Sequence, residues 1–522
     1  MTLAYRHRIP FLVPAALLVA LGACGGGQET TTSTGGGGSG TSDGAGGTGT
    51  GASDGGLFQT NAGGSTGGST SSATTTSTPP DPSDLCQSPN PTNPSSAWTK
   101  KAGTAQVQTA LGVTADAQGN VLVVGNYLGS IDFGAGALTS AGQNDAYVAK
   151  LDPNGAALWS KSFGDAQYHQ YVQHVATDAQ NNILVTGHFR GTINFGGGAL
   201  SNASNFFEDI FVAKLTPAGA HVWSKRYGDI NTEESQAIDA DAQGNVLVVG
   251  AFQKTINFGG GALVAEDDGY NGFVAKLDAS GNQLWAKSLG DTATEQKTIG
   301  VTADADGNVY IVGHHQGSID LGAPMVAEAG KQNAYVAKLS PAGAFLWAKS
   351  WASTSAAAVD VAVDAGGNVF VLGNFKGKAS FGGKEFDAGS TNNVFLVKLD
   401  KEGDHVWSKD FGVPTDADEA TSLRLDGGKP VLFGAFTKQI DFGGGALTSG
   451  GGYDVFLAKL DEEGCEIHSA SYGGAMLQRG ETLGIDPTGN ILIAGSFDGT
   501  VDFGTGPVTA EATDAYVVKI KP

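Results

Sequence analysis

Cationic residues are scarce in this sequence. The 522 residues contain 30 Lys and Arg against 52 Asp and Glu, which gives a formal net charge of −22 at pH 7. Such a surface repels nucleic-acid phosphates, and no long run of Lys or Arg compensates for it, so we expect no nucleic-acid partner. Charged residues of both signs amount to only 16%, whereas Val, Ile, Phe, Tyr and Thr recur in short runs. This composition favours strands over helices.

Catalytic motifs are also lacking. No nucleophile elbow, Ser-His-Asp order or Walker loop stands out, and the many Gly-x-Gly strings open no helix. His188 and His314 hold the same place in two repeats, but a metal site needs three or four convergent ligands, which the repeat does not supply. An enzyme would need a non-repeating cluster of acids, His or Arg, and the sequence shows none. We therefore expect no catalytic residue, no metal site and no cofactor.

The first 23 residues have the layout of a secretory signal peptide. Arg6 and Arg8 precede an apolar stretch over residues 9–20, which is shorter than the roughly 20 residues that span a bilayer. The stretch ends in Leu-Gly-Ala-Cys24, which resembles the lipobox of bacterial lipoproteins. That resemblance implies a lipid on Cys24 and, because Gly25 follows it, the outer membrane. We expect an outer-membrane lipoprotein, periplasmic or exposed at the cell surface; an ordinary signal peptide with a chance cysteine is the alternative.

Residues 24–96 have the composition of a tether. They are dominated by Gly, Ser, Thr, Ala, Asp and Pro, with few apolar side chains. Such a segment buries too little apolar surface to offset its chain entropy. A Gly/Ser-rich coil of this length reaches roughly 40 Å. We expect it to hold the rest of the chain away from the membrane to which the lipid attaches it.

The remaining residues, 97–522, consist of repeats about 62 residues long. Each repeat contains four short apolar runs separated by turn signals such as Asp-x-x-Gly-Asn, as expected for four antiparallel strands. Equivalent positions near the start of the fourth run are Trp98, Trp159, Trp223, Trp285, Trp347, Trp407 and, in degenerate form, His468. Four strands per repeat of this length are typical of a β-propeller blade.

The two ends of the repeat region fix the number of blades. The chain ends on a third strand around Tyr516, and the repeat region begins on a fourth strand at Trp98. Pairing these two strands completes a seventh blade and leaves no open edge. The sequence therefore predicts an all-β, seven-bladed propeller of four-stranded antiparallel blades, closed by the N-terminal strand.

The repeat motif resembles that of a known family. An Asx residue, an aromatic-Val-Ala-Lys-Leu-Asp strand, a Gly turn, Trp-Ser-Lys and then Asp-x-x-Gly-Asn-Val recur along residues 97–522. This pattern is similar to the seven-bladed β-propeller (SBBP) repeats of bacterial surface proteins and to Delta-60 repeats. The resemblance implies the fold and says little about activity, because a propeller scaffold hosts many functions.

Polar residues recur at three positions of the repeat. The first set precedes the third strand: Asp145, Asp209, Asn271, Asn333, Asn393, Asp454 and Asp514. The second lies in the Gly-rich loop: Asp132, Asn194, Asn257, Asp320, Asp441 and Asp502. We expect these side chains to cap loop amides, with Ca²⁺ binding as the alternative. The third set is Lys150, Lys214, Lys276, Lys338, Lys398, Lys459 and Lys519, expected to neutralise the Asx side chains or to be solvated at the blade edge.

Two cysteines remain after Cys24. Cys86 precedes the strand that completes blade 7, and Cys465 precedes the equivalent strand of blade 6. An even pair in an oxidising compartment favours a disulfide. We predict a Cys86–Cys465 bond that pins the closing strand; two free thiols are the alternative.

The longer, more variable loops should all emerge on one face of the ring. These are the loops between the second and third strands and those from blade to blade, and function is expected there. Blades 2 and 3 carry the most distinctive side chains. The candidate binding face consists of Tyr168, His169, Tyr171, Phe206, Phe207, Glu266, Asp267, Asp268 and Tyr270. Aromatic groups beside acids suit a sugar or a protein loop.

These observations predict a non-enzymatic cell-envelope or surface lipoprotein. We expect a monomer whose propeller binds an as yet unidentified protein or glycan. One alternative is a propeller enzyme, either a glycan lyase or hydrolase or a quinone-dependent dehydrogenase. The other is a purely structural envelope component.

Overall fold

The computed structural model describes Cys86 and residues 94–204, 206–265, 269–290, 294–328 and 330–522. The predicted signal peptide, the lipidation site Cys24 and nearly all of the tether lie outside the described residues, as do Glu266, Asp267 and Asp268. Every regular element that is described is a β-strand, and no helix long and apolar enough to cross a membrane occurs among these residues.

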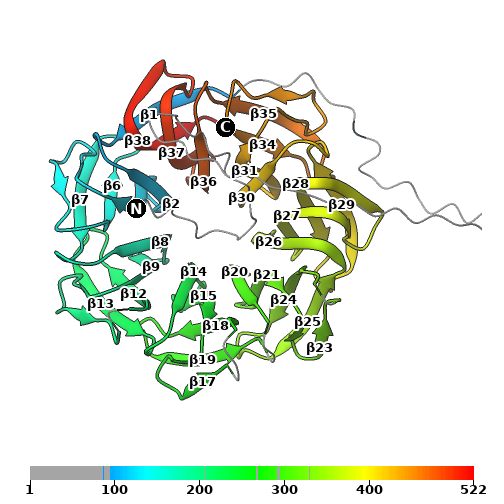
Figure 1. Ribbon diagram of the computed structural model, residues 1–522, viewed down its shortest axis with the longest axis horizontal. Helices are drawn as coiled ribbons and strands as arrows, with labels where there is room; N and C mark the ends of the chain where they lie inside the picture. Colours follow the sequence, from blue (N-terminus) through cyan, green and yellow to red (C-terminus); the bar gives the residue numbers. More distant parts are fainter. Residues whose placement is uncertain (1–85, 87–93, 205, 266–268, 291–293, 329) are drawn as a thin grey trace, which may run out of the picture. The chain divides into compact units, whose positions relative to one another are not determined.

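Seven four-stranded antiparallel sheets form the blades of a closed ring (Figure 1). The fold is therefore the seven-bladed β-propeller that the repeats predict. Blade 1 comprises β2 (Gln108–Ala115), β3 (Val121–Tyr127), β6 (Asp145–Leu151) and β7 (Ala157–Phe163). Blade 2 comprises β8 (Gln170–Thr177), β9 (Ile183–Phe189), β12 (Asp209–Leu215) and β13 (His221–Tyr227). Blade 3 comprises β14 (Glu233–Ala240), β15 (Val246–Phe252), β18 (Asn271–Leu277) and β19 (Gln283–Ser288).

The other four blades follow the same order. Blade 4 comprises β20 (Gln296–Ala303), β21 (Val309–His315), β24 (Asn333–Leu339) and β25 (Phe345–Trp351). Blade 5 comprises β26 (Ser353–Val363), β27 (Val369–Ser380), β28 (Glu385–Leu399) and β29 (His405–Phe411). Blade 6 comprises β30 (Asp418–Asp426), β31 (Lys429–Phe436), β34 (Asp454–Leu460) and β35 (Glu466–Tyr472). Blade 7 comprises β36 (Gln478–Ile485), β37 (Ile491–Asp502), β38 (Pro507–Ile520) and β1 (Ser96–Ala102).

The first strand of each blade lies innermost and the fourth outermost (Figure 1). The second and third strands are almost completely buried; in β3 and β6, for example, every residue is buried. Both faces of these strands are covered by neighbouring blades, which explains their continuous apolar sequences. The hydrophobic core is consequently divided into layers between blades, such as the one in which β9 and β12 pack on β3 and β6.

The Gly-rich segment between the second and third strands differs from the predicted loop, because it contains a short ribbon. Five blades have a separate hairpin: β4 (Ser130–Ile131) with β5 (Leu138–Thr139), β10 (Thr192–Ile193) with β11 (Leu200–Ser201), β16 (Thr255–Asn257) with β17 (Ala262–Val264), β22 (Ser318–Asp320) with β23 (Pro324–Val326), and β32 (Gln439–Ile440) with β33 (Leu447–Thr448). The ribbon forms because buried apolar side chains alternate with exposed ones along this segment. Ile256 and Phe258 are buried, and the Phe258 ring lies 5.2 Å from that of Phe273.

Each outer-strand tryptophan packs on the next blade. The indole Nε1 of Trp223 donates to the Ala279 carbonyl of blade 3, 3.0 Å away. The ring lies over Gly281, where a Cβ would approach it to 3.1 Å, and the positive φ of Gly281 (79°) also favours glycine. The lack of this contact explains why blade 6 has His468 in place of the tryptophan. Its partner turn would lie in blade 7, where the third and fourth strands come from opposite ends of the chain, so no such turn exists.

The recurring lysines are buried in five blades and partly buried in the other two, which corrects the expectation that they are solvated or neutralise the Asx positions before the third strand. Lys276 is 2% exposed, and its Nζ lies 2.8 Å from Asp241 of the first turn in its own blade. It also donates to the Pro341 carbonyl of blade 4. Equivalent ion pairs are Lys150–Asp116, Lys214–Asp178, Lys338–Asp304, Lys459–Asp426 and Lys519–Asp486. We call each pair a turn latch.

The turn latches are electrostatically favourable because further hydrogen bonds stabilise the charged forms of both the aspartate and the lysine, as for Asp241 and Lys276. Burial by itself would raise the pKa of Asp241, but hydrogen bonds from Lys276 and Asn245 outweigh that effect and hold the pKa below its usual value. Blade 5 is the exception. Lys398 lies over the Phe370 ring at 5.2 Å and donates to the Glu462 carbonyl of blade 6.

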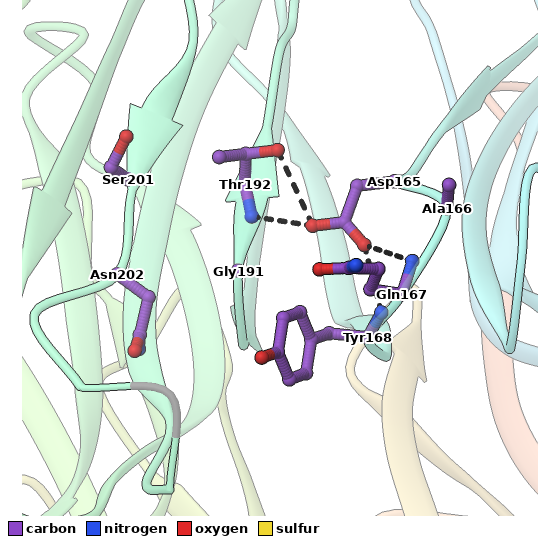
Figure 2. Close-up of a pocket in the computed structure, with 8 residues that line it drawn as sticks. All are labelled: Asp165, Ala166, Gln167, Tyr168, Gly191, Thr192, Ser201 and Asn202. Carbon is purple, nitrogen blue, oxygen red and sulfur yellow. Dashed lines mark hydrogen bonds between the residues drawn. The ribbon is translucent and has the colours of Figure 1, made fainter.

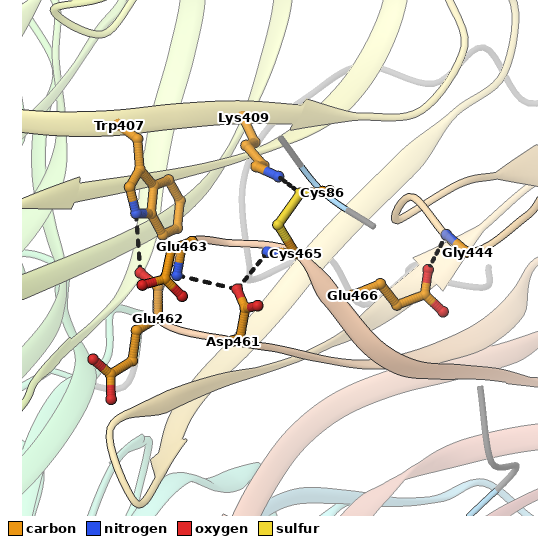
Figure 3. The surroundings of a disulfide bond; sticks show 9 residues. All are labelled: Cys86, Trp407, Lys409, Gly444, Asp461, Glu462, Glu463, Cys465 and Glu466. Atoms are coloured by element: carbon orange, nitrogen blue, oxygen red, sulfur yellow. Dashed lines mark hydrogen bonds between the residues drawn. A yellow bond between two sulfur atoms is a disulfide. The ribbon is translucent and has the colours of Figure 1, made fainter. Parts of the chain in front are cut away.

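The ring is closed in two places. β1 pairs antiparallel with β38, with Trp98 opposite Lys519, so the N-terminal strand completes blade 7 as predicted. Cys86 and Cys465 form the predicted disulfide (Figure 3). The Cys465 amide donates to Asp461 at 2.7 Å, and Lys409 Nζ lies 3.3 Å from Cys86 Sγ. The segment before β1 is thus bonded to a turn of blade 6.

Candidate functional site

All the longer loops emerge on one side of the ring, which we call the variable face; the opposite side is the turn face. Backbone hydrogen bonds join the two kinds of loop within a blade, as between Arg190 and His169 in blade 2. The predicted capping by Asx residues is present. The Asn257 carboxamide accepts from Gly259 at 2.7 Å, and Asp145 accepts from Ala141 at 2.8 Å. These groups stiffen the loops and leave other side chains to face the solvent.

A shallow open pocket of about 410 Å³ lies between two loops of blade 2 (Figure 2). It is lined by Asp165, Ala166, Gln167, Tyr168, Gly191, Thr192, Ser201 and Asn202. The Tyr168 ring forms one wall, half-buried against Gly191. The φ of Gly191 is +69°, and a Cβ there would come within 2.5 Å of the Tyr168 ring. Glycine is therefore required for this close approach.

The single acid of this pocket is fully engaged. Asp165 accepts hydrogen bonds from the amides of Gln167, Tyr168 and Thr192, at 2.9, 2.8 and 2.7 Å. Burial alone would raise the pKa of Asp165, and these backbone bonds outweigh it and lower the pKa. Its role is to hold the two loops together, so the accessible part of the pocket is an aromatic ring beside uncharged polar groups.

A second feature lies at the variable-face ends of the innermost strands. One position near the start of each first strand differs from blade to blade: Thr109, Tyr171, Glu234, Lys297, Ala357, Glu419 and Arg479. Its neighbours on the second strand are Asn126, His188, Ala251, His314, Asn374, Ala435 and Ser496. This corrects the expectation that the chain has no non-repeating cluster of titratable residues.

In blade 2 this position belongs to a group of aromatic and charged side chains. The His169 ring stacks on Tyr171 with centroids 5.3 Å apart, and Tyr171 meets His188 edge-on at the same distance. Glu208 Oε2 lies 3.5 Å from His188 Nε2, and its Oε1 lies 3.5 Å from Arg190 Nε. Burial lowers the pKa of His169, whereas burial and the Glu208 charge raise that of Tyr171.

A second group joins blades 3 and 4. Lys297 Nζ lies 3.0 Å from Glu234, 3.4 Å from Glu295 and 4.7 Å from the centre of the Tyr270 ring. Burial would lower the pKa of Lys297, but the two glutamates raise it. Burial, then the charge of Glu234, raise the pKa of Tyr270, with a smaller contribution from Glu208 of the blade 2 group. We call His169, Tyr171, His188, Arg190, Glu208, Glu234, Tyr270, Glu295 and Lys297 the mouth cluster.

His314 lies beneath this cluster. It is fully buried, and within the described residues neither ring nitrogen has a hydrogen-bond partner. Burial and the positive charge of Lys297 lower its pKa to about 3. The imidazole is therefore neutral at physiological pH, and we regard it as part of the packing between β20 and β24.

The first residue of the innermost strand is a recurring glutamine with a structural task. Gln170 accepts from the Asp165 amide and donates to the Arg190 carbonyl, which fixes both loops. Blade 3 has Glu233 here and blade 6 has Asp418. Burial and neighbouring aspartates raise the pKa of Glu233 to about 10, and burial and Asp416 raise that of Asp418 to about 8. A protonated carboxyl offers both an O–H donor and a carbonyl acceptor, so it can both donate and accept hydrogen bonds, as the amide it replaces does.

The structure brings most of the predicted binding residues together and adds others. Tyr168 lines the pocket, His169, Tyr171 and Tyr270 belong to the mouth cluster, and Phe206 and Phe207 are 80% and 43% exposed on the same face. Sequence reasoning missed His188, Arg190, Glu208, Glu234, Glu295 and Lys297. Among the described residues, no group of three or more His, Cys, Asp or Glu is placed to hold a metal ion.

No protein-family model matches the chain, and the resemblance to SBBP repeats stays a prediction. The chain is similar to an uncharacterised WD repeat-containing protein of Acanthamoeba polyphaga mimivirus, with 20% identity over 508 residues, 81% of this chain and 33% of that protein. It is also 26% identical over 227 residues to the regulatory protein FlaEY of Caulobacter vibrioides, covering 42% of this chain and 23% of that protein. The chain thus spans a third or less of each relative.

The chain also has a likeness to several solved structures, with low sequence identity and low TM-scores. An endosialidase of phage phi92 is 8% identical with a TM-score of 0.39, covering 81% of this chain and 69% of the other. The WD40 domain of Neurospora crassa Pan2 is 9% identical with a TM-score of 0.34, over 67% of this chain and 88% of the other. An ulvan lyase is 10% identical with a TM-score of 0.37, over 83% and 95%. An endosialidase, a lyase and a WD40 domain thus occur among these structures.

Proposed function

We propose that this chain is a lipid-anchored, non-enzymatic binding scaffold of the cell envelope. In this proposal Cys24 carries the lipid, residues 24–96 act as the tether, and a glycan or protein binds on the variable face over blades 2 to 4. The observation that supports it best is the contrast between the faces. The turn latches repeat, whereas the pocket, Phe206 and the mouth cluster are specific to a few blades.

A binding experiment tests the proposal. The mature chain with Cys24→Ser, exported so that its disulfide forms, is screened on an array of glycans and envelope proteins. We expect a ligand whose binding is weakened by Phe206→Ala with Arg190→Ala, since both side chains are exposed. Val413→Ala with Met476→Ala, on exposed loop residues of blades 6 and 7, is the matched control. A ligand that the control variants disturb as strongly as the test pair would contradict the assignment to blades 2 to 4.

A separate experiment tests the membrane anchor. In a bacterial host fed with an alkyne-labelled fatty acid, the wild-type chain should acquire the label and sediment with membranes. The Cys24→Ser chain should do neither. Labelling that persists in the variant would remove Cys24 as the lipidation site.

A glycan-cleaving enzyme is the second candidate. The mouth cluster favours it, because it gathers histidine, tyrosine, glutamate and arginine side chains within contact distance. The raised pKa of Tyr171 speaks against that phenol as a general base, since it stays protonated at neutral pH. Release of new reducing ends from a bound glycan, abolished by His188→Ala, would support the enzyme; an unchanged glycan after long incubation would exclude it.

A further inference from the structure

The blade 2 pocket is built on a frame that other blades share. Beyond the buried part of the second strand, one glycine has a positive φ and faces a side chain near the start of the first strand. Gly129 faces Gln106, Gly377 faces Thr354 and Gly499 faces Met476, each with a Cβ approach of 2.6–2.8 Å. Gly191 faces Tyr168 in the same way. Blade 2 therefore carries a flat aromatic ring where these blades carry flexible or small side chains.

The groups that the pocket offers to a ligand are uncharged. The carboxylate of Asp165 is occupied by hydrogen bonds from three backbone amides and from the Thr192 hydroxyl. Asn202 is also engaged, because its amide donates to the Phe189 and Phe207 carbonyls and its oxygen accepts from Ser204. The groups that remain toward solvent are the Tyr168 ring and the exposed side chains of Gln167 and Ser201.

We infer that the blade 2 pocket binds an uncharged sugar ring, stacked on Tyr168 and hydrogen-bonded by Gln167 and Ser201. A pyranose offers an apolar C–H face to an aromatic ring and hydroxyl groups at its edge, which matches one ring beside an amide and a hydroxyl. The volume of about 410 Å³ lies in the range of small-molecule sites. The inference rests on the proposed function and names the ligand of that face.

The frame makes the site rigid before a ligand arrives. Both walls are held by Asp165 and by the hydrogen bonds of Gln170 to each loop. Little loop ordering is then needed on binding, which reduces the entropic cost of association. Among the described residues, no Lys or Arg lines the pocket, and Arg190, which precedes Gly191 in the chain, forms an ion pair with Glu208 at 3.5 Å. An anionic sugar would therefore find no unpaired cation in this pocket.

The test uses the mature Cys24→Ser chain and two panels of defined oligosaccharides, one neutral and one containing uronic or sialic acids, titrated by calorimetry. We expect binding of a neutral oligosaccharide that Tyr168→Ala weakens by about tenfold or more, as loss of a stacking contact predicts. Tyr168→Phe keeps the ring and should stay within about threefold of the wild type. Met476→Ala, at the equivalent position of blade 7, should leave the affinity unchanged.

One further variant and a stability measurement keep the result interpretable. Ser201→Trp fills the pocket from the opposite loop and should abolish binding without removing Tyr168. Equal melting temperatures of all variants separate a lost site from lost folding. Neutral binding that survives both Tyr168→Ala and Ser201→Trp overturns the inference, as does the absence of any neutral ligand. Binding of an acidic sugar or a protein that depends on Arg190 and Phe206, and not on Tyr168, overturns the inference while the proposed function stands. If no ligand of either panel or of the array depends on blades 2 to 4, both fail.

Discussion

The two faces of the ring differ in how closely the blades repeat one another. On the turn face, an aspartate of the first turn, a buried lysine and a carbonyl of the next blade recur, as in Asp241, Lys276 and Pro341. On the variable face, the equivalent position of the innermost strand holds tyrosine in blade 2, glutamate in blade 3 and lysine in blade 4. The comparison teaches that the lysine contacts that recur from blade to blade lie on one face, whereas the side chains of the innermost strands vary on the other.

The largest effect should follow from breaking a turn latch. Lys276→Met removes one partner of a pair whose side chains are 3% and 0% exposed, and it leaves the Asp241 charge buried. We expect a loss of about 3–5 kcal/mol in the free energy of unfolding, measured by urea denaturation. Lys398→Met is the matched control, because that lysine contacts a ring and a carbonyl instead, and its loss should cost less. Equal effects of the two variants would show that the ion pair contributes nothing specific.

Loss of the disulfide should come next. Cys465→Ser removes a crosslink between residues that lie 379 positions apart in the sequence. We expect the free energy of unfolding to fall by about 2–5 kcal/mol. Reduction of the wild type should reproduce the shift in the urea midpoint and should not affect the variant further. A variant as stable as the oxidised wild type would indicate that the pairing of β1 with β38 alone closes the ring.

Glu233→Gln tests how the buried carboxyl of blade 3 makes the free energy of unfolding depend on pH. The pKa of Glu233 is about 10 in the folded chain, against an ordinary value of 4.5, so the folded state holds an extra proton between these values. The contribution of Glu233 to the free energy of unfolding must then fall as pH rises through this window, and that contribution is highest below pH 4.5. Glu233→Gln should remove this decline and stabilise the chain at pH 8 by about 1–3 kcal/mol. Gln170→Glu in blade 2 should produce the opposite change; a variant with the pH profile of the wild type would refute the assignment.

The smallest effect on stability should follow from changes on the variable face. Tyr168→Ala and Phe206→Ala remove half-buried or exposed rings without breaking a turn latch. We expect changes within about 0.5 kcal/mol in the free energy of unfolding. A much larger loss for either variant would mean that the loops of blade 2 contribute to the ring itself.

The sequence predicted the parts of the molecule that repeat. The period, the aromatic third strands and the unpaired strand at each end were sufficient for the blade number, the closure and the Cys86–Cys465 bond. The turn latches were missed because Asp241 and Lys276 lie far apart in the chain and meet only when the strands pair. Their burial also depends on the next blade, which a single repeat does not reveal.

The mouth cluster was missed for a different reason. Glu208, Glu234 and Lys297 come from three blades, and each looks like an ordinary surface charge within its own repeat. Aligning the first strands position by position would have exposed the series that runs through Tyr171, Glu234 and Lys297. The tyrosine of the pocket was recognised because aromatic residues are conspicuous in a polar loop, whereas its role depends on the close approach of Gly191.

The bond between Cys86 and Cys465 also determines how mechanical load enters the ring. If the chain is anchored through Cys24, as proposed, a pull on the tether reaches Cys86 first and passes through the sulfur bridge into the blade 6 turn. Stretching single molecules from the N-terminus should therefore give a higher first rupture force in oxidised than in reduced chains, and equal forces would contradict this load path. The closing strand β1, which pairs only with β38, would then carry almost none of the tension. In that case the disulfide protects the pairing of β1 with β38 from tension on the tether.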